Sequence, residues 1–150
     1  MAVCVVPASF DPYVFLHDHQ RQVFASPGGF GATAVFVGTM RDFNEGDEVR
    51  GMTLEHYPGM TEKHLQAICD EAATRWTLLE TLVVHRVGDI EPGEPIVLVA
   101  AWSAHRAEAF EACRFIMEDL KSKAPFWKKE RLREGSSRWV ARNTPGKTER

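Results

Sequence analysis

A cluster of basic residues close to the C-terminal end carries the side chains best suited to chemistry. Lys121 and Lys128 stand on either side of Pro125, with the aromatic pair Phe126-Trp127 between Pro125 and Lys128. Two ammonium groups that converge on one pocket bind phosphate, and each lowers the pKa of the other toward the range useful for proton transfer or nucleophilic attack. The alternative is structural, because lysines near the end of a helix also complement its dipole. The aromatic pair between the cations favours a binding site.

Two further positions are suited to binding an anion. Ser103, Ala104, His105 and Arg106 stand where an apolar strand is expected to pass into a helix. The free N–H groups and positive dipole end of a helix N-terminus attract anions, and His105 and Arg106 add donors. An ordinary first turn with side chains in solvent explains the same residues equally well. Arg41 follows another predicted strand, a common place for binding residues, and is weak evidence by itself.

Other kinds of chemistry leave no signature. The glycine-rich segment 28–31 precedes a strand rather than a helix, so it matches neither common phosphate-binding loop. His17 and His19 are two residues apart on a predicted polar helix and do not share a face, which favours surface histidines. His56 and His85 lie inside predicted strands and are better explained as sheet or core residues. We therefore expect no metal site and no cofactor.

The cysteines also point away from a metal or disulfide framework. Cys4, Cys69 and Cys113 are far apart and form no C-x-x-C pair. An odd number of isolated thiols argues against both a zinc site and paired disulfides. We interpret the three thiols as structural or incidental, since free cysteines are commonly buried.

Length and composition indicate one globular domain spanning residues 1–150. A chain of 150 residues with 44% hydrophobic and 26% charged residues is typical of such a domain. No apolar run approaches the roughly 18 residues of a membrane span, and the N-terminus lacks the basic start of a secretory signal. We therefore expect a cytoplasmic protein with no membrane partner.

The net charge of −3 hides an asymmetry along the chain. Residues 1–120 hold 8 basic and 18 acidic side chains, whereas residues 121–150 hold 10 basic and 3 acidic ones. A basic block on an acidic body suggests an anionic partner, such as a nucleic acid, a membrane surface or a phosphorylated small molecule.

The hydrophobic pattern of the first half predicts one helix and two strands. Asp11 is expected to cap a helix that runs to about Ala25, with a proline at its first position. The segment 31–40 is rich in β-branched and small apolar residues, which predicts a strand buried on both faces. A polar loop is expected at 41–48 and a second strand at 49–57.

The next segments predict a helix followed by two strands. Thr61 is expected to cap a helix that ends near Trp76, whose apolar residues recur at the spacing of one buried stripe. Strands are predicted at 82–87 and 95–102, separated by a Pro-Gly turn.

A long helix and two short stretches complete the chain. Ser103 is expected to cap a helix that ends near Ser122, with Phe110 on its buried stripe and a proline just beyond it. Short amphipathic stretches follow at 126–132 and 138–142. Strand pairs joined by turns, with two main helices, favour an α+β fold with a mostly antiparallel sheet over a parallel α/β fold.

Several motifs, in the same order, resemble the large, catalytic subunit of molybdopterin synthase. The similarity runs from about Gly31 to Val140 and leaves segments 1–30 and 143–150 outside it. Because the motifs are separate and correctly ordered, the match is more specific than any one of them. They are LEHYPGMTEK at 54–63, HRVG at 85–88, SAHR at 103–106, AFE at 109–111 and LKSKAPFWKKE at 120–130.

The resemblance implies a sulfurtransferase of molybdenum cofactor biosynthesis, which converts cyclic pyranopterin monophosphate into molybdopterin by installing the dithiolene. In this family the sulfur arrives as a thiocarboxylate on the C-terminal glycine of a small ubiquitin-like partner, whose tail enters a pocket of the large subunit. A central homodimer of large subunits with a small subunit at each end forms a heterotetramer. The family fold is an α/β hammerhead with a small antiparallel subdomain, which is compatible with the α+β prediction.

The resemblance also implies roles for individual residues. Lys121 and Lys128 match the two family lysines regarded as catalytic, and His105 and Arg106 match the pair that lines the pocket for the pterin phosphate. The other matches are the substrate-binding Arg41 and Arg138 and the possible pocket-lining residues Phe36, Met117 and Glu130.

Other interpretations remain open on the sequence alone. A nucleic-acid-binding module would use the basic, aromatic C-terminal segment to track phosphates and stack bases, although the acidic rest of the chain speaks against it. A non-catalytic scaffold that only docks a ubiquitin-like tail fits the same spacing. A persulfide carried by a cysteine is disfavoured, because Cys69 and Cys113 fall on apolar helix stripes and Cys4 lies outside the matched motifs.

Overall fold

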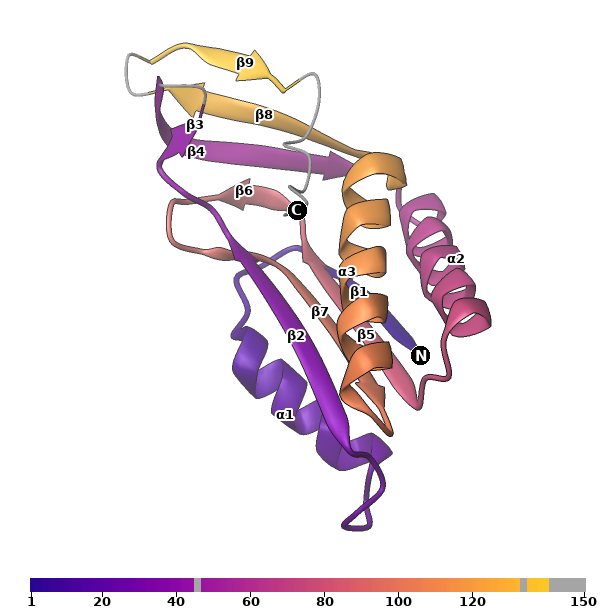
Figure 1. Cartoon of the computed structure of the whole chain (residues 1–150). Helices are drawn as coiled ribbons and strands as arrows, with labels where there is room; N and C mark the ends of the chain where they lie inside the picture. Colours follow the sequence, from indigo (N-terminus) through magenta and orange to yellow (C-terminus); the bar gives the residue numbers. More distant parts are fainter. Residues whose placement is uncertain (45–46, 133–134, 141–150) are drawn as a thin grey trace, which may run out of the picture.

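The computed structural model describes residues 1–44, 47–132 and 135–140. Within these residues, three helices and two sheets confirm the predicted α+β class. One sheet of four strands has helices on both faces, and a second, antiparallel sheet lies across one end of it (Figure 1). The end of the amphipathic stretch predicted at 138–142, including Arg142, lies outside the described residues. So does the tail 143–150, which lies outside the family match.

The four-stranded sheet forms the centre of the molecule, in the strand order β1-β5-β7-β2. Its strands β5 and β7 are buried along almost their whole length, because helices cover both faces. The β2–β7 and β5–β7 pairs are antiparallel, whereas β1 runs parallel to β5. The bounds are β1 (Ala2–Val6), β2 (Ala32–Thr39), β5 (Glu80–Arg86) and β7 (Pro95–Ser103).

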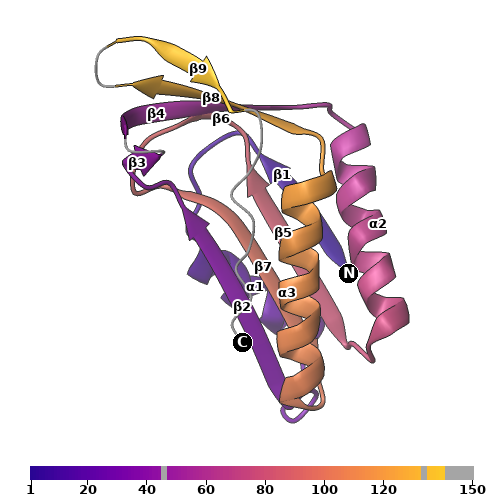
Figure 2. The same cartoon turned by 45° about the horizontal axis from the view of Figure 1, so that its top comes forward.

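The three helices divide between the two faces of this sheet. Helix α1 (Pro12–Val23) lies on one face, and α2 (Met60–Arg75) and α3 (Arg106–Lys123) lie on the other (Figures 1 and 2). The predicted cap of α1 is confirmed, because the Asp11 carboxylate accepts hydrogen bonds from two N–H groups of the first turn. None of the described helices is long and apolar enough to cross a membrane.

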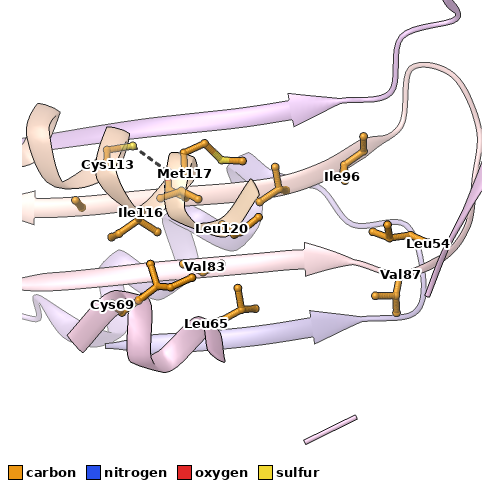
Figure 3. Close-up of a cluster of buried hydrophobic side chains, with 14 of the residues drawn as sticks. Leu54, Leu65, Cys69, Val83, Val87, Ile96, Cys113, Ile116, Met117 and Leu120 are labelled. Carbon is orange, nitrogen blue, oxygen red and sulfur yellow. Dashed lines mark hydrogen bonds between the residues drawn. The ribbon is translucent and has the colours of Figure 1, made fainter. Parts of the chain in front are cut away.

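The larger core lies between the sheet and helices α2 and α3 (Figure 3). Leu65 from α2, Ile116 from α3 and Val83 from β5 meet there, each fully or almost fully buried. Burying one such side chain contributes about 1.5–3 kcal/mol. Cys69 and Cys113 belong to the same cluster, and burial raises the pKa of each thiol to about 11. These two cysteines are therefore inert structural residues, as expected.

The second sheet is antiparallel throughout its described strands and is organised around β4. Strand β4 pairs with β8 along most of its length, with β3 near its start and with β6 near its end. The bounds are β3 (Phe43–Asn44), β4 (Asp47–His56), β6 (Gly88–Ile90), β8 (Phe126–Leu132) and β9 (Ser137–Trp139). The predicted polar loop at 41–48 is therefore wrong in part, since it holds β3 and the start of β4.

Three short strands lacked a usable signal in the sequence. Strand β1 has five residues and pairs with a distant part of the chain, Ala2 opposite Leu82. Strands β3 and β6 have only two and three residues. Such short strands form because a longer strand beside them offers hydrogen-bonding partners. The fold decides which strand lies beside them, so the pattern of residues within the short segment does not reveal the pairing.

Both predicted caps of the later helices are wrong. Helix α2 begins at Met60 after Gly59, so Thr61 lies inside the first turn, where it is fully buried. Helix α3 begins after His105, and the expected cap Ser103 is instead the last residue of β7. The Ser103 hydroxyl donates to the His105 carbonyl and so shapes the loop before the helix.

Four side chains differ from their predicted environments. Phe110 is 66% exposed, so it lies off the buried stripe of α3. Strand β2 was expected to be buried on both faces, yet Val35 and Phe36 are 40% and 41% exposed because β2 is an edge strand of its sheet. His19 is not a surface residue, since its Nε2 lies 2.9 Å from the Glu80 carboxylate and its ring packs near Trp102.

Candidate active site

The bend between α3 and β8 brings Lys121 and Lys128 together. Lys121 lies in the last turn of α3, and Lys128 is the third residue of β8. Ala124 is extended and Pro125 follows it, so the chain reverses from helix into strand within a few residues. The two amines are within hydrogen-bonding range of each other. The structure therefore brings together the two lysines that the sequence singled out.

A buried hydroxyl ties this bend to helix α2. Thr61 Oγ1 donates to the carbonyl of Pro125 at 3.3 Å and accepts from the backbone N–H of Tyr57 at 3.1 Å. Thr61 has no exposed surface, so water is not available to replace either bond. The start of α2 thus helps to fix the bend that carries the lysine pair.

Burial lowers the pKa of both lysines. The pKa of Lys121 falls to about 7, first because its amine is taken out of water and second because Lys128 lies beside it. Burial also lowers the pKa of Lys128, but the hydrogen bond to Lys121 and the nearby Glu130 carboxylate act in the opposite direction. The pair is therefore best described as a neutral Lys121 amine that accepts a hydrogen bond from a Lys128 ammonium.

Glu130 and Arg138 form the charged surroundings of Lys128. Alternate residues of a strand share a face, so Lys128 and Glu130 point the same way from β8, opposite Leu54 and Met52 of β4. Arg138 on β9 donates from Nε to the Glu130 carboxylate at 3.0 Å. Glu130 is almost fully buried, and this ion pair keeps its charge compensated.

Arg41 adds a further cation to the same region. It lies two residues after the end of β2, and its side chain is exposed. The charge of Arg41 contributes to lowering the pKa of Lys128, which locates the guanidinium within electrostatic range of the pair. The structure thus places Arg41 within electrostatic range of Lys128 and joins Arg138 to the neighbouring Glu130.

His85 is the residue of this region whose chemistry the sequence reasoning missed. It was interpreted as a sheet or core histidine, and it is indeed almost fully buried in β5. Its ring stacks on Phe126 of β8 at a centroid distance of 3.9 Å. Burial, together with the nearby charges of Lys121 and Lys128, lowers its pKa to about 3. The HRVG motif was the available signal, because it places a polar pair at the end of a buried strand.

The remaining predicted pocket residues lie along α3 and β2. Met117 is one turn before Lys121 and is buried in the larger core. Phe36 lies in the middle of β2, opposite Val99 of β7. Met117 is therefore part of the scaffold that precedes Lys121, whereas the Phe36 side chain is 41% exposed on the edge strand.

His105 and Arg106 are not part of this cluster within one chain. They stand at the N-terminal end of α3, and Lys121 stands near its C-terminal end. Fifteen residues of helix separate Arg106 from Lys121, a length of about 22 Å at 1.5 Å per residue. Both His105 and Arg106 are exposed. The predicted phosphate-binding pair and the predicted catalytic pair therefore occupy opposite ends of the same helix.

The chemical capacity of the cluster follows from these positions. A neutral amine beside an ammonium both accepts and donates protons near neutral pH. The guanidinium of Arg41 adds positive charge that attracts an anion, and Glu130 offsets part of the charge of Lys128. Among the described residues, no group of three or more His, Cys, Asp or Glu side chains is arranged to hold a metal ion.

Comparison with known proteins gives a consistent result. Residues 13–123 match the MoaE protein family. The chain is 55% identical over 141 residues to the molybdopterin synthase catalytic subunit of Pseudomonas aeruginosa, covering 93% of this chain and 90% of that protein. It resembles the solved structure of a molybdopterin biosynthesis MoaE protein from Burkholderia ambifaria, with a TM-score of 0.78 and 44% identity over 96% of this chain and 92% of that one.

A more distant structure shares the fold. It is described as a protein–protein complex of subunits 1 and 2 of the molybdopterin-converting factor from Helicobacter pylori. The TM-score is 0.75 and the identity 21%, over 95% of this chain and 92% of that chain. At this identity the similarity supports the fold alone.

We expect the Lys121 amine to titrate near pH 7, because burial disfavours its charged form. Competitive labelling with acetic anhydride, read by peptide mass spectrometry, reports the fraction of each amine that is neutral. Labelling of Lys121 is expected to rise through about pH 7 and then level off, with exposed Lys123 as the reference for reagent reactivity. A midpoint at the ordinary lysine value of about 10.4 would contradict the buried pair.

We expect Thr61→Val to lower the free energy of unfolding by about 1–3 kcal/mol, because it leaves the Tyr57 N–H and the Pro125 carbonyl without their shared partner. Urea denaturation followed by circular dichroism measures this change. Thr61→Ser keeps the hydroxyl and is the matched control. Equal stability of the Val variant and the native chain would show that the bend does not depend on this bridge.

Proposed function

The chain belongs to the MoaE protein family and is the catalytic subunit of a molybdopterin synthase, a sulfurtransferase, and from this premise we propose that its chemistry is carried by the lysine pair at the α3–β8 bend. The enzyme converts cyclic pyranopterin monophosphate into molybdopterin. The observation that carries the proposal is the burial of two hydrogen-bonded lysine amines, Lys121 and Lys128, beside the carboxylate of Glu130. A buried amine with a pKa near 7 is a common feature of catalytic lysines.

The two lysines take different roles. Lys121, neutral near pH 7, accepts a proton as sulfur replaces oxygen on the substrate. Lys128 remains an ammonium, supported by Glu130, and stabilises the negative charge that develops in the transition state. Arg41 contributes to the attraction of the anionic substrate. The short helix–proline–strand connection holds both amines in place before substrate arrives, so little reorganisation is needed during the reaction.

The sulfur donor in this proposal is a small ubiquitin-like subunit whose C-terminal glycine carries a thiocarboxylate. Such a tail ends in an anion, and the cations Lys121, Lys128 and Arg41 suit an anionic end. The two-subunit composition of the Helicobacter pylori complex is in line with a separate small subunit. The cysteines are poor alternatives as sulfur carriers, because the buried thiols Cys69 and Cys113 have raised pKa values.

His105 and Arg106 take part if the protein acts as a homodimer. In one chain they lie about 22 Å along α3 from Lys121, too far to hold the phosphate of a substrate that also contacts the lysines. A second copy that brings its α3 N-terminus to the lysine pair removes this conflict. The edge strand β2, with Val35 and Phe36 exposed, offers an apolar surface for such a contact. The proposed assembly is a dimer of this chain with one small subunit at each end.

The family assignment favours this function over the two alternatives left open by the sequence. A nucleic-acid-binding surface needs its cations in water along one face, whereas Lys128 is half-buried with the Glu130 carboxylate nearby. A scaffold that only docks a tail does not require a buried amine with a pKa near 7. We also place the protein in the cytoplasm, where free thiols such as its three cysteines stay reduced.

Lys121→Ala is expected to reduce product formation at least about 100-fold while the small subunit still binds, because the variant lacks the proton acceptor. The assay follows conversion of cyclic pyranopterin monophosphate by thiocarboxylated small subunit under single-turnover conditions. Lys123→Ala, two residues away and exposed, is the matched control and is expected to retain the native rate. Native activity in the Lys121 variant would exclude the proposed role.

Mixing two inactive variants tests whether two copies share a site. Lys121→Ala and Arg106→Ala homodimers each lack one part of every site, but a mixed dimer contains one site with both native residues. Equal mixing after reversible dissociation is expected to restore about a quarter of the native site concentration, given random pairing in a twofold dimer. Calorimetry on Arg106→Ala alone is expected to show weakened binding of the pterin substrate. Absence of recovered activity in verified mixed dimers would indicate sites that lie within one chain.

A further inference from the structure

His85 lies at the point where the two sheets and helix α3 meet. Along β5, Val83 belongs to the core under α2 and α3, whereas Leu82 and Val84 belong to the core under α1. Since side chains alternate between faces, His85 points to the same face as Val83. It is only 3% exposed. The imidazole is therefore enclosed beneath the bend that carries the lysine pair.

The hydrogen bonding of His85 settles which nitrogen carries its proton. Nδ1 lies 2.9 Å from the backbone carbonyl of Arg86, and a carbonyl oxygen only accepts hydrogen bonds. Nδ1 must therefore be the donor. Burial and the surrounding cations oppose a second proton on the ring, and the pKa is lowered to about 3. Nε2 is consequently a hydrogen-bond acceptor near neutral pH.

Titratable groups from three elements act electrostatically on the ring. They are Lys121 at the end of α3, Lys128 on β8 and His56 on β4. The stacked ring of Phe126 lies two residues before Lys128 and on the same face of β8. The stacking and the Nδ1 hydrogen bond together prevent the imidazole from turning, so the direction of its Nε2 lone pair is fixed.

We propose that His85 is a positioning residue for the lysine pair, a neutral ring whose Nε2 accepts a hydrogen bond from the proton-bearing amine and holds it in place. The inference rests on the proposed catalytic role of Lys121 and Lys128. An acceptor without charge suits this place, since a carboxylate would raise the lysine pKa values and a charged imidazole would repel the ammonium. His85 thus favours one proton on the pair and keeps it at a defined position.

Nitrogen NMR on the native protein tests the state of the ring without any substitution or activity. With ¹⁵N-labelled histidine, long-range spectra distinguish Nδ1–H from Nε2–H tautomers and neutral from charged rings. His85 is expected to stay neutral and protonated on Nδ1 between about pH 5 and pH 8, where an ordinary histidine titrates. A ring that becomes charged in this range, or carries its proton on Nε2, overturns the proposal.

Two variants separate a positioning role from a purely structural one. His85→Phe keeps an aromatic ring to stack on Phe126 but removes both nitrogens, whereas His85→Gln offers an amide oxygen near the position of Nε2. Loss of the acceptor disfavours the charged amine, so in His85→Phe the acid limb of the pH–rate profile is expected to move about one unit lower. The misplaced amine is expected to reduce kcat about 10- to 100-fold with little change in KM. His85→Gln is expected to restore part of both effects.

The outcomes also distinguish this inference from the proposed function. If His85→Phe loses stability but keeps the native midpoint of the pH–rate profile and of Lys121 labelling, His85 is only structural and the inference fails. In that case, loss of activity in Lys121→Ala still supports the proposed function, because that test does not involve His85. If the Phe variant does not fold, the tautomer measured on the native protein and the profile of the Gln variant decide. A Gln variant whose pH–rate profile moves part of the way to lower pH, with a native ring in the Nδ1–H state, supports the proposal, whereas a Gln variant with the native profile overturns it.

Discussion

The structure around the α3–β8 bend depends on one constraint, that two half-buried lysine amines are placed side by side. Two charged amines in such a place repel each other and lose hydration, so the favoured state holds a single proton between Lys121 and Lys128. Glu130 compensates the remaining charge and is in turn held by Arg138. His85 is kept neutral by the same cations. The protonation states of the region are therefore linked to one another.

Helix α3 and strand β8 act as one continuous positioning element. The apolar stripe of α3 packs it on the first sheet, and the pairing of β8 with β4 anchors the chain after the bend. Thr61 joins the bend to α2, so three elements fix the geometry of the lysines. The N-terminal end of α3 is different. The length of the helix keeps His105 and Arg106 far from Lys121. A rigid helix with useful cations at both ends is well suited to serve two sites in a symmetric dimer.

Much of the fold could be predicted from local pattern, and the errors have a common physical origin. The Asp11 cap, the buried stripe of α2 and the strand-rich segments 82–87 and 95–102 depend on neighbouring residues, which a sequence displays directly. Strands β1, β3 and β6 depend on partners elsewhere in the chain. Burial of Phe110 was predicted from its spacing on α3 alone. A residue at the edge of an apolar helix stripe stays exposed where no other helix or strand packs over it, and Phe110 is such a residue.

For the site, the sequence by itself determined the family and which residues are candidates for the chemistry. The spacing of Lys121 and Lys128 around Pro125, with the ordered motifs, was sufficient to single out both lysines. Only the tertiary structure decided that the pKa of Lys121 is lowered to about 7, that His85 lies within electrostatic range of the pair and that Arg106 lies at the far end of the helix. The reason is that a pKa depends on burial and on nearby charges, and both are set by contacts between segments that are distant in the chain.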